Sequence, residues 1–169
     1  MKNALLLGLL LVLPCHAGRE KIAKDKYSLE FPDDWKKPTG DTGAALIVRE
    51  NKDGTALFAV SKLAVKDGAK ADLDATAKSV AADYKKNMGL KEDPKVEPGE
   101  VDGLDARFVV IASPKKDKPA AGDDPATAVY LVLVDAKTEV LILQATLAMP
   151  AAKKTSEACL AIIQSFKRE

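Results

Sequence analysis

Two apolar segments in the second half of the chain, residues 126–134 and 139–148, run almost without a polar interruption. A short polar turn, residues 135–138, joins them. Strands with one solvent-exposed face alternate apolar and polar residues, whereas nearly continuous apolar strands are typical of sheets covered on both faces. We therefore predict that these segments are the central strands of a sheet with further layers packed against both faces.

Shorter patterns predict the remaining strands of the sheet. Asp53-Gly54 separates two apolar runs and favours a hairpin, and Asp102-Gly103 favours a turn before a third run. An alternating apolar and polar segment also predicts a strand near the start of the domain. The predicted strands outside the central pair are residues 27–31, 44–48, 56–65 and 104–112.

Two segments have the spacing of amphipathic helices. Apolar residues recur at helical intervals over 73–88, where Asp72 can cap the start and Gly89 can end the helix. A second helix is predicted over 156–165. The polar stretch 91–100 is predicted as a connection. The order of strands and helices favours an α+β fold, in which an antiparallel β-sheet is flanked by helices.

Two short segments resemble a known family. Residues 27–35, Y-S-L-E-F-P-D-D-W, are similar to the opening strand, proline and tryptophan of the PsbP-like proteins, and residues 161–167, A-I-I-Q-S-F-K, are similar to their closing helix. This family includes an extrinsic subunit of the photosynthetic oxygen-evolving complex, a Ran-binding import factor and bacterial envelope proteins of the DcrB type. The resemblance implies a PsbP-like α/β/α sandwich of the DcrB branch that acts by docking on partners and is not an enzyme.

The first 17 residues have the layout of a secretory signal peptide. Lys2 precedes the apolar run 4–13, and Cys15 and Ala17 are small residues at the positions that signal peptidase prefers. We expect cleavage after Ala17, which leaves 152 of the 169 residues as a single domain, 18–169. The expected location is periplasmic or secreted in a bacterium.

A lipid anchor is the alternative outcome of processing. Cys15 lies just after the apolar run, where a lipoprotein carries its lipidated cysteine. Pro14 and Leu13 fit poorly before such a cysteine, so soluble export is the favoured prediction. The domain would be attached to a membrane only if Cys15 is lipidated.

Composition excludes several classes of function. The chain has 26 Lys and Arg against 25 Asp and Glu, and loss of Lys2 with the signal balances them, which argues against nucleic acid as a partner. Cleavage also removes His16, the only histidine, and leaves Cys159 as the only cysteine. A histidine-dependent triad cannot be assembled, and Cys159 is predicted to be buried and inert.

Two segments match catalytic motifs. Asp41-Thr42-Gly43-Ala44 spells the D-T-G-A signature of aspartic proteases, but one copy could work only in a homodimer, and no apolar strand delivers Asp41. Ser113 begins an S-x-x-K match that lacks its helix and its partner motifs. No catalytic residue is predicted, and the homodimeric protease using Asp41 stays as an alternative function.

No metal or cofactor site is predicted. The acidic pairs Asp33-Asp34 and Asp123-Asp124 lack EF-hand spacing, and the chain has no Gly-rich phosphate-binding motif. A weak calcium site is left open, and so is the oligomeric state.

The partner is predicted to be an envelope protein, and the candidate recognition element is the charged loop 113–125. Long connections on a compact scaffold are uncommon without a function. Trp35, by contrast, is expected to close the core. A small-ligand or lipid carrier is a further alternative and predicts an apolar cavity between sheet and helix. The predicted partner-binding residues are Lys115, Lys116, Lys118, Asp123 and Asp124.

Overall fold

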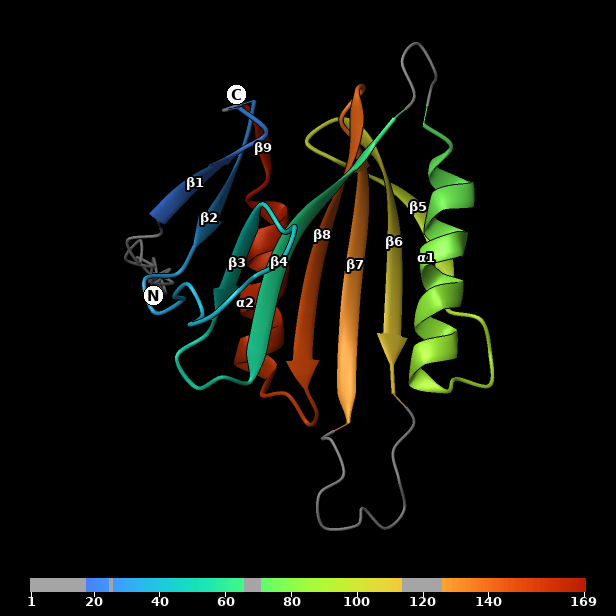
Figure 1. Cartoon of the computed structure of the whole chain (residues 1–169). Helices are drawn as coiled ribbons and strands as arrows, with labels where there is room; N and C mark the ends of the chain where they lie inside the picture. Colours follow the sequence, from blue (N-terminus) through green and yellow to red (C-terminus); the bar gives the residue numbers. More distant parts are fainter. Residues whose placement is uncertain (1–17, 25, 66–70, 114–125) are drawn as a thin grey trace, which may run out of the picture.

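An antiparallel sheet of six strands forms the centre of the molecule (Figure 1). A computed structural model describes residues 18–24, 26–65, 71–113 and 126–169. The predicted central pair, β7 and β8, occupies the middle of the sheet, which confirms that prediction. In spatial order the strands are β3 (Ile47–Glu50), β4 (Ala56–Ala64), β8 (Glu139–Ala148), β7 (Thr127–Asp135), β6 (Leu104–Ala112) and β5 (Val96–Val101).

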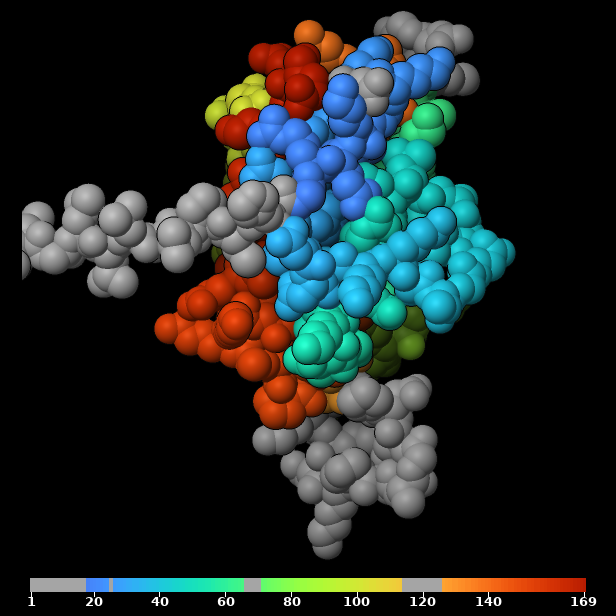
Figure 2. All heavy atoms as spheres, turned by 90° about the vertical axis from the view of Figure 1, so that its left-hand side faces the viewer, coloured from blue at the N-terminus to red at the C-terminus, as the bar shows by residue number. Residues whose placement is uncertain are grey.

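A second, three-stranded sheet lies beside the first and was not predicted. It consists of β1 (Gly18–Ile22), β2 (Tyr27–Phe31) and β9 (Lys167–Arg168), with β2 in the middle. Figure 2 shows β1 and β2 in blue on this side of the molecule, with the red C-terminal residues beside them. The two ends of the described chain therefore meet in one small sheet.

The helices α1 (Leu73–Met88) and α2 (Lys153–Gln164) pack on opposite faces of the six-stranded sheet. Alternate residues of β7 show the division, because Val132 belongs to the core on the α2 side and Leu131 to the core on the α1 side. The small sheet packs on the same side as α2. The result is the predicted α+β fold of the α/β/α sandwich type.

Helix α1 has the ends that its sequence predicts. The carboxylate of Asp72 accepts a hydrogen bond from the backbone N–H of Ala75 at 2.9 Å, and Gly89 adopts a left-handed conformation, with φ of 64°. A β-carbon disfavours that conformation, which makes glycine a natural end to the helix. Helix α2 begins three residues before its predicted start and has no side-chain cap.

The predicted connection over 91–100 is wrong in its second half, because residues from Val96 form β5. Pro98 and Gly99 hid this strand from the sequence pattern. A proline is tolerated here because β5 is at the edge of the sheet, where its missing N–H removes no inner hydrogen bond. The predicted strand 44–48 is also shifted, since β3 begins only at Ile47.

The core between the large sheet and α2 is closely filled by apolar side chains. Phe58 and Leu143 are fully buried, and Phe31 meets Phe58 edge to face with ring centroids 5.6 Å apart. Trp35 is buried in the same cluster, as predicted. Within the described residues, no helix is both long and apolar enough to cross a membrane.

Candidate functional site

The predicted recognition loop joins β6 to β7. Its candidate residues, Lys115, Lys116, Lys118, Asp123 and Asp124, lie outside the described residues, and their role stays a prediction. The two ends of the loop are fixed by backbone and side-chain contacts. The N–H of Ser113 donates to the carbonyl of Thr127 at 2.8 Å, and the N–H of Thr127 donates to Oγ of Ser113 at 2.7 Å.

Two large apolar side chains are exposed beside the ends of this loop. Val110, near the end of β6, is 58% exposed, and Met149, directly after β8, is 43% exposed. Met149 is tied to the loop end because its N–H donates to the carbonyl of Ala126 at 2.6 Å. Val110 alternates with Val109 and Ile111, which are buried on the α1 side, so Val110 lies on the other face of the sheet.

The residues of the two catalytic motifs lie in turns or strand ends. Asp41 is exposed, and its carboxylate accepts the N–H of Gly43 at 2.9 Å, as in an ordinary Asx turn. An aspartic protease holds its aspartates at the centre of a cleft, so this position does not fit that mechanism. Ser113 uses its Oγ to fix the loop end, which is a structural role.

Cys159 is buried on the inner face of α2, as predicted, with 1% of its surface exposed. Burial raises the pKa of the thiol to about 11. A nucleophilic cysteine needs a lowered pKa, because the thiolate is the reactive form. Cys159 is therefore a core residue.

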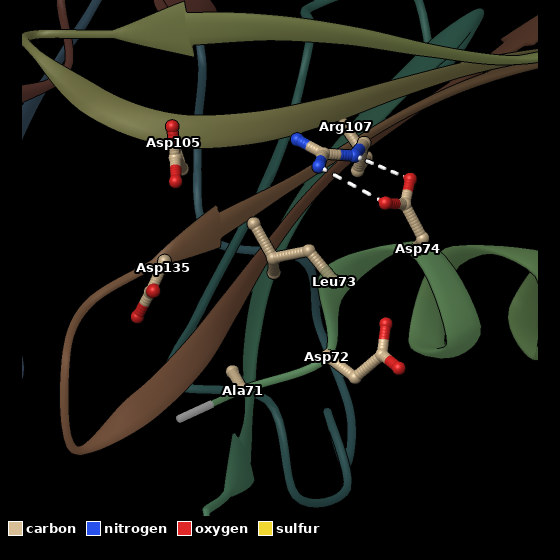
Figure 3. Close-up of a pocket in the computed structure, with 7 residues that line it drawn as sticks. All are labelled: Ala71, Asp72, Leu73, Asp74, Asp105, Arg107 and Asp135. Carbon is tan, nitrogen blue, oxygen red and sulfur yellow. Dashed lines mark hydrogen bonds and ion pairs between the residues drawn. The ribbon is translucent and has the colours of Figure 1, made fainter.

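An acidic hollow lies between the start of α1 and the adjacent ends of β6 and β7 (Figure 3). Its volume is about 350 Å³. Arg107 from β6 and Asp74 from α1 form a two-point ion pair across it, with Nε to Oδ1 at 2.7 Å and Nη2 to Oδ2 at 3.2 Å. The lining residues are Ala71, Asp72, Leu73, Asp74, Asp105, Arg107 and Asp135.

The ion pair keeps both partners of the acidic hollow charged. The hydrogen bond from Arg107 lowers the pKa of Asp74, and the pair raises the pKa of Arg107. The third guanidinium nitrogen donates to the carbonyl of Ala106 at 2.8 Å, so each nitrogen of Arg107 has an acceptor. A general acid or base needs a pKa near the working pH. The ion pair moves the pKa of Asp74 down and that of Arg107 up, in both cases away from neutral pH. The pair fastens α1 to the sheet.

A second hollow, of about 210 Å³, lies at the opposite end of the same sheet face. Its lining residues come from the start of β4 and the end of β8, two strand ends that lie side by side in Figure 1. The register aligns Glu50, Leu57 and Thr146 in one row across three strands. Its other lining residues are Gly54, Thr55, Ala56, Thr127 and Ala148. We call it the Glu50 hollow.

Neither hollow has the chemistry of a metal or carrier site. Among the described residues, no group of three or more histidine, cysteine or acidic side chains is arranged to hold a metal ion. The acidic pair Asp33-Asp34 is exposed. Both hollows open to solvent, and large apolar side chains fill the space between sheet and α2 where a lipid carrier would need a cavity.

The architecture defines a class, the PsbP-like α+β fold. No protein-family model matches the chain, and no curated protein matches it in sequence. The likeness is to solved structures that share very little sequence, and it therefore shows the fold alone.

Particular solved structures carry this likeness over nearly the whole chain. Cyanobacterial PsbP (CyanoP) from Synechocystis has a TM-score of 0.63 at 9% identity, covering 100% of this chain and 99% of that one. The Ran-binding protein Mog1p of Saccharomyces cerevisiae has a TM-score of 0.55 at 10% identity, covering 90% and 95%. A protein from Bacteroides thetaiotaomicron has a TM-score of 0.54 at 13% identity, covering 89% of this chain and 48% of that one.

Proposed function

We propose that this chain is an exported, non-catalytic binding or accessory protein of the bacterial cell envelope, of the DcrB type, that docks on a protein partner. The observation that carries the proposal is the exposure of Val110 and Met149 beside the ends of the charged loop 113–125. Exposed apolar side chains rimmed by charged residues are typical of protein-docking surfaces. The loop residues Lys115, Lys116, Lys118, Asp123 and Asp124 would form the charged rim.

The proposed route to the envelope rests on the signal-peptide layout of residues 1–17, with cleavage after Ala17. The product is a single domain, 18–169, in the periplasm or outside the cell.

The absence of catalysis is supported by the environments of the candidate groups. Cys159 is buried with its thiol protonated, Asp41 sits in an exposed turn, and Asp74 is held ionised by Arg107. One fold neighbour supports a docking role, since Mog1p is a Ran-binding protein.

Affinity capture from the native envelope tests the proposal. The loop variant replaces residues 114–125 by a short glycine turn between Ser113 and Ala126, whose positions the adjoining strands already fix. We expect this variant to keep its fold and to lose the partner that the wild-type protein captures. The matched control is Lys137→Glu, an exposed charge change in the turn at the opposite end of β7. Equal capture by wild type and loop variant would overturn the loop assignment.

Intact-mass measurement of the processed protein tests the route to the envelope. Cleavage after Ala17 predicts an unmodified chain that begins at Gly18. A chain that begins at Cys15 and carries the mass of attached lipid would show the alternative, a tethered protein.

A further inference from the structure

The Glu50 hollow is the part of the described surface with the clearest chemical preference. At about 210 Å³ it is smaller than the 300 to 1,000 Å³ typical of small-molecule pockets. It is therefore suited to one long side chain and not to a whole ligand of drug size. The hollow also lies near the proposed docking loop, because Thr127, which lines it, is the second residue after that loop.

The walls of the hollow combine an apolar strip with polar groups. Leu57, Ala56 and Ala148 supply apolar contacts, and Thr55 and Thr146 supply hydroxyl groups. The Thr55 hydroxyl accepts a hydrogen bond from Asn51 Nδ2 at 2.9 Å, and the Thr146 hydroxyl accepts one from Gln144 Nε2 at 3.0 Å. Each hydroxyl oxygen is thereby held by a neighbouring amide and keeps a second lone pair, with which it can accept a further hydrogen bond.

Among the described residues that line the hollow, Glu50 is the only charged one. Within the described residues its carboxylate makes no hydrogen bond and no ion pair, although the residue is half-buried. Its backbone N–H and carbonyl are both paired with Lys36 at 2.8 Å, so the position of the residue is fixed. The exposed side chain of Lys36 forms no ion pair with it.

A half-buried carboxylate, carried by a fixed backbone at the end of an apolar strip, is complementary to a flexible aliphatic stem that ends in a positive charge. Lysine has this structure, since its methylene stem packs on apolar surface while the ammonium group takes up to three acceptors. We propose that the Glu50 hollow receives a lysine side chain of the protein partner, with the carboxylate of Glu50 as its counter-charge. This inference rests on the proposed docking function and specifies the chemistry of the partner at one position.

The test is an amide NMR titration of the full exported protein with Nα-acetyl-lysine methylamide. We expect saturable shifts at Thr55, Leu57 and Thr146, and about tenfold weaker binding to the Glu50→Gln variant, because a charge-assisted hydrogen bond is lost. Asp53→Asn is the matched control, since Asp53 is exposed nearby but does not line the hollow. Its affinity should equal that of wild type.

A second compound tests whether the positive charge is needed for binding. Nα-acetyl-norleucine methylamide, with an apolar side chain and no ammonium group, should bind about tenfold more weakly than the lysine compound. Equal affinity for the two compounds, undiminished binding to Glu50→Gln, or shifts confined to the acidic hollow around Arg107 would each overturn the inference. The titration uses no partner, so its failure leaves the envelope capture experiment, and with it the proposed function, to be judged separately.

Discussion

Arg107 on β6 and Asp74 in the first turn of α1 are joined by two hydrogen bonds, at 2.7 and 3.2 Å, across the opening of the acidic hollow. The pair links a helix to a strand 33 residues away in the chain. Paired geometry of this kind fixes orientation as well as distance, because the planar guanidinium matches the carboxylate at two points. It therefore adds an oriented polar contact between the first turn of α1 and the sheet.

The pair predicts a pH-dependent contribution to stability. The pKa of Asp74 is lowered in the folded protein, so its contribution is fully present above the ordinary aspartate pKa of about 3.9 and is lost as the pH falls through the folded value. Asp74→Asn should be less stable than wild type at pH 7. Urea unfolding at pH 7 and near pH 2 measures this, and a difference that is unchanged between the two would contradict it.

A close approach between Gly99 and Phe108 predicts a coupled pair. A β-carbon added at Gly99 would lie 2.6 Å from Cε2 of Phe108, so the ring must move. Gly99→Ala should cost about 1 to 3 kcal/mol, as overpacking does. In the Phe108→Ala background the same change should cost much less. A double-mutant cycle in urea measures the coupling, and additive effects would show that the ring does not limit this position.

The burial of Phe58 predicts a large effect of its truncation on stability. The side chain is fully buried between the large sheet and the small one and meets Phe31 edge to face. Phe58→Ala should lower the free energy of unfolding by about 3 to 5 kcal/mol, because it leaves a cavity among packed neighbours. Leu63→Ala, at a residue that is 42% exposed on the same strand, is the control and should cost far less. Similar losses at the two positions would contradict the assigned core.

The thiol of Cys159 predicts a difference between native and unfolded protein. Because its pKa is raised to about 11 by burial, a thiol reagent at pH 8 should label the native protein very slowly. In denaturant the cysteine should react at the rate of a free thiol. Rapid labelling of the native protein would contradict the buried position.

The elements predicted from sequence are those whose local pattern agrees with their place in the fold. The helix over 73–88 has an apolar stripe, a capping aspartate and a terminating glycine, and the structure has it between the same residues. The central strands are apolar on both faces because helices cover both faces. Local and tertiary preferences point the same way in these segments.

The strands that were missed are held by contacts that no local pattern contains. Strand β1 is short and polar, and it is fastened by pairing with β2 and by the ion pair between Glu20 and Arg49 at 2.6 Å. Strand β5 contains Pro98 and Gly99, which only an edge position accommodates. Both assignments depend on neighbours that are distant in the sequence.

The Glu50 hollow could not be predicted for a similar reason. Glu50, Leu57 and Thr146 come from three strands, and only the register of the sheet places them in one row. Taken singly, each is an ordinary strand residue. The charged loop 113–125, by contrast, could be proposed from the sequence, because its length and its charge can be read from one continuous segment.

Photocrosslinking in living cells tests the central claim, that a protein partner docks at the loop end of the sheet. A photoreactive phenylalanine analogue would replace Val110, which is 58% exposed beside the loop. In the control it would replace Leu63, which is 42% exposed near the end of β4 that lies away from the loop. We expect a discrete crosslinked envelope protein from position 110 and none from position 63. No crosslinked protein from position 110, or the same product from both positions, would contradict it.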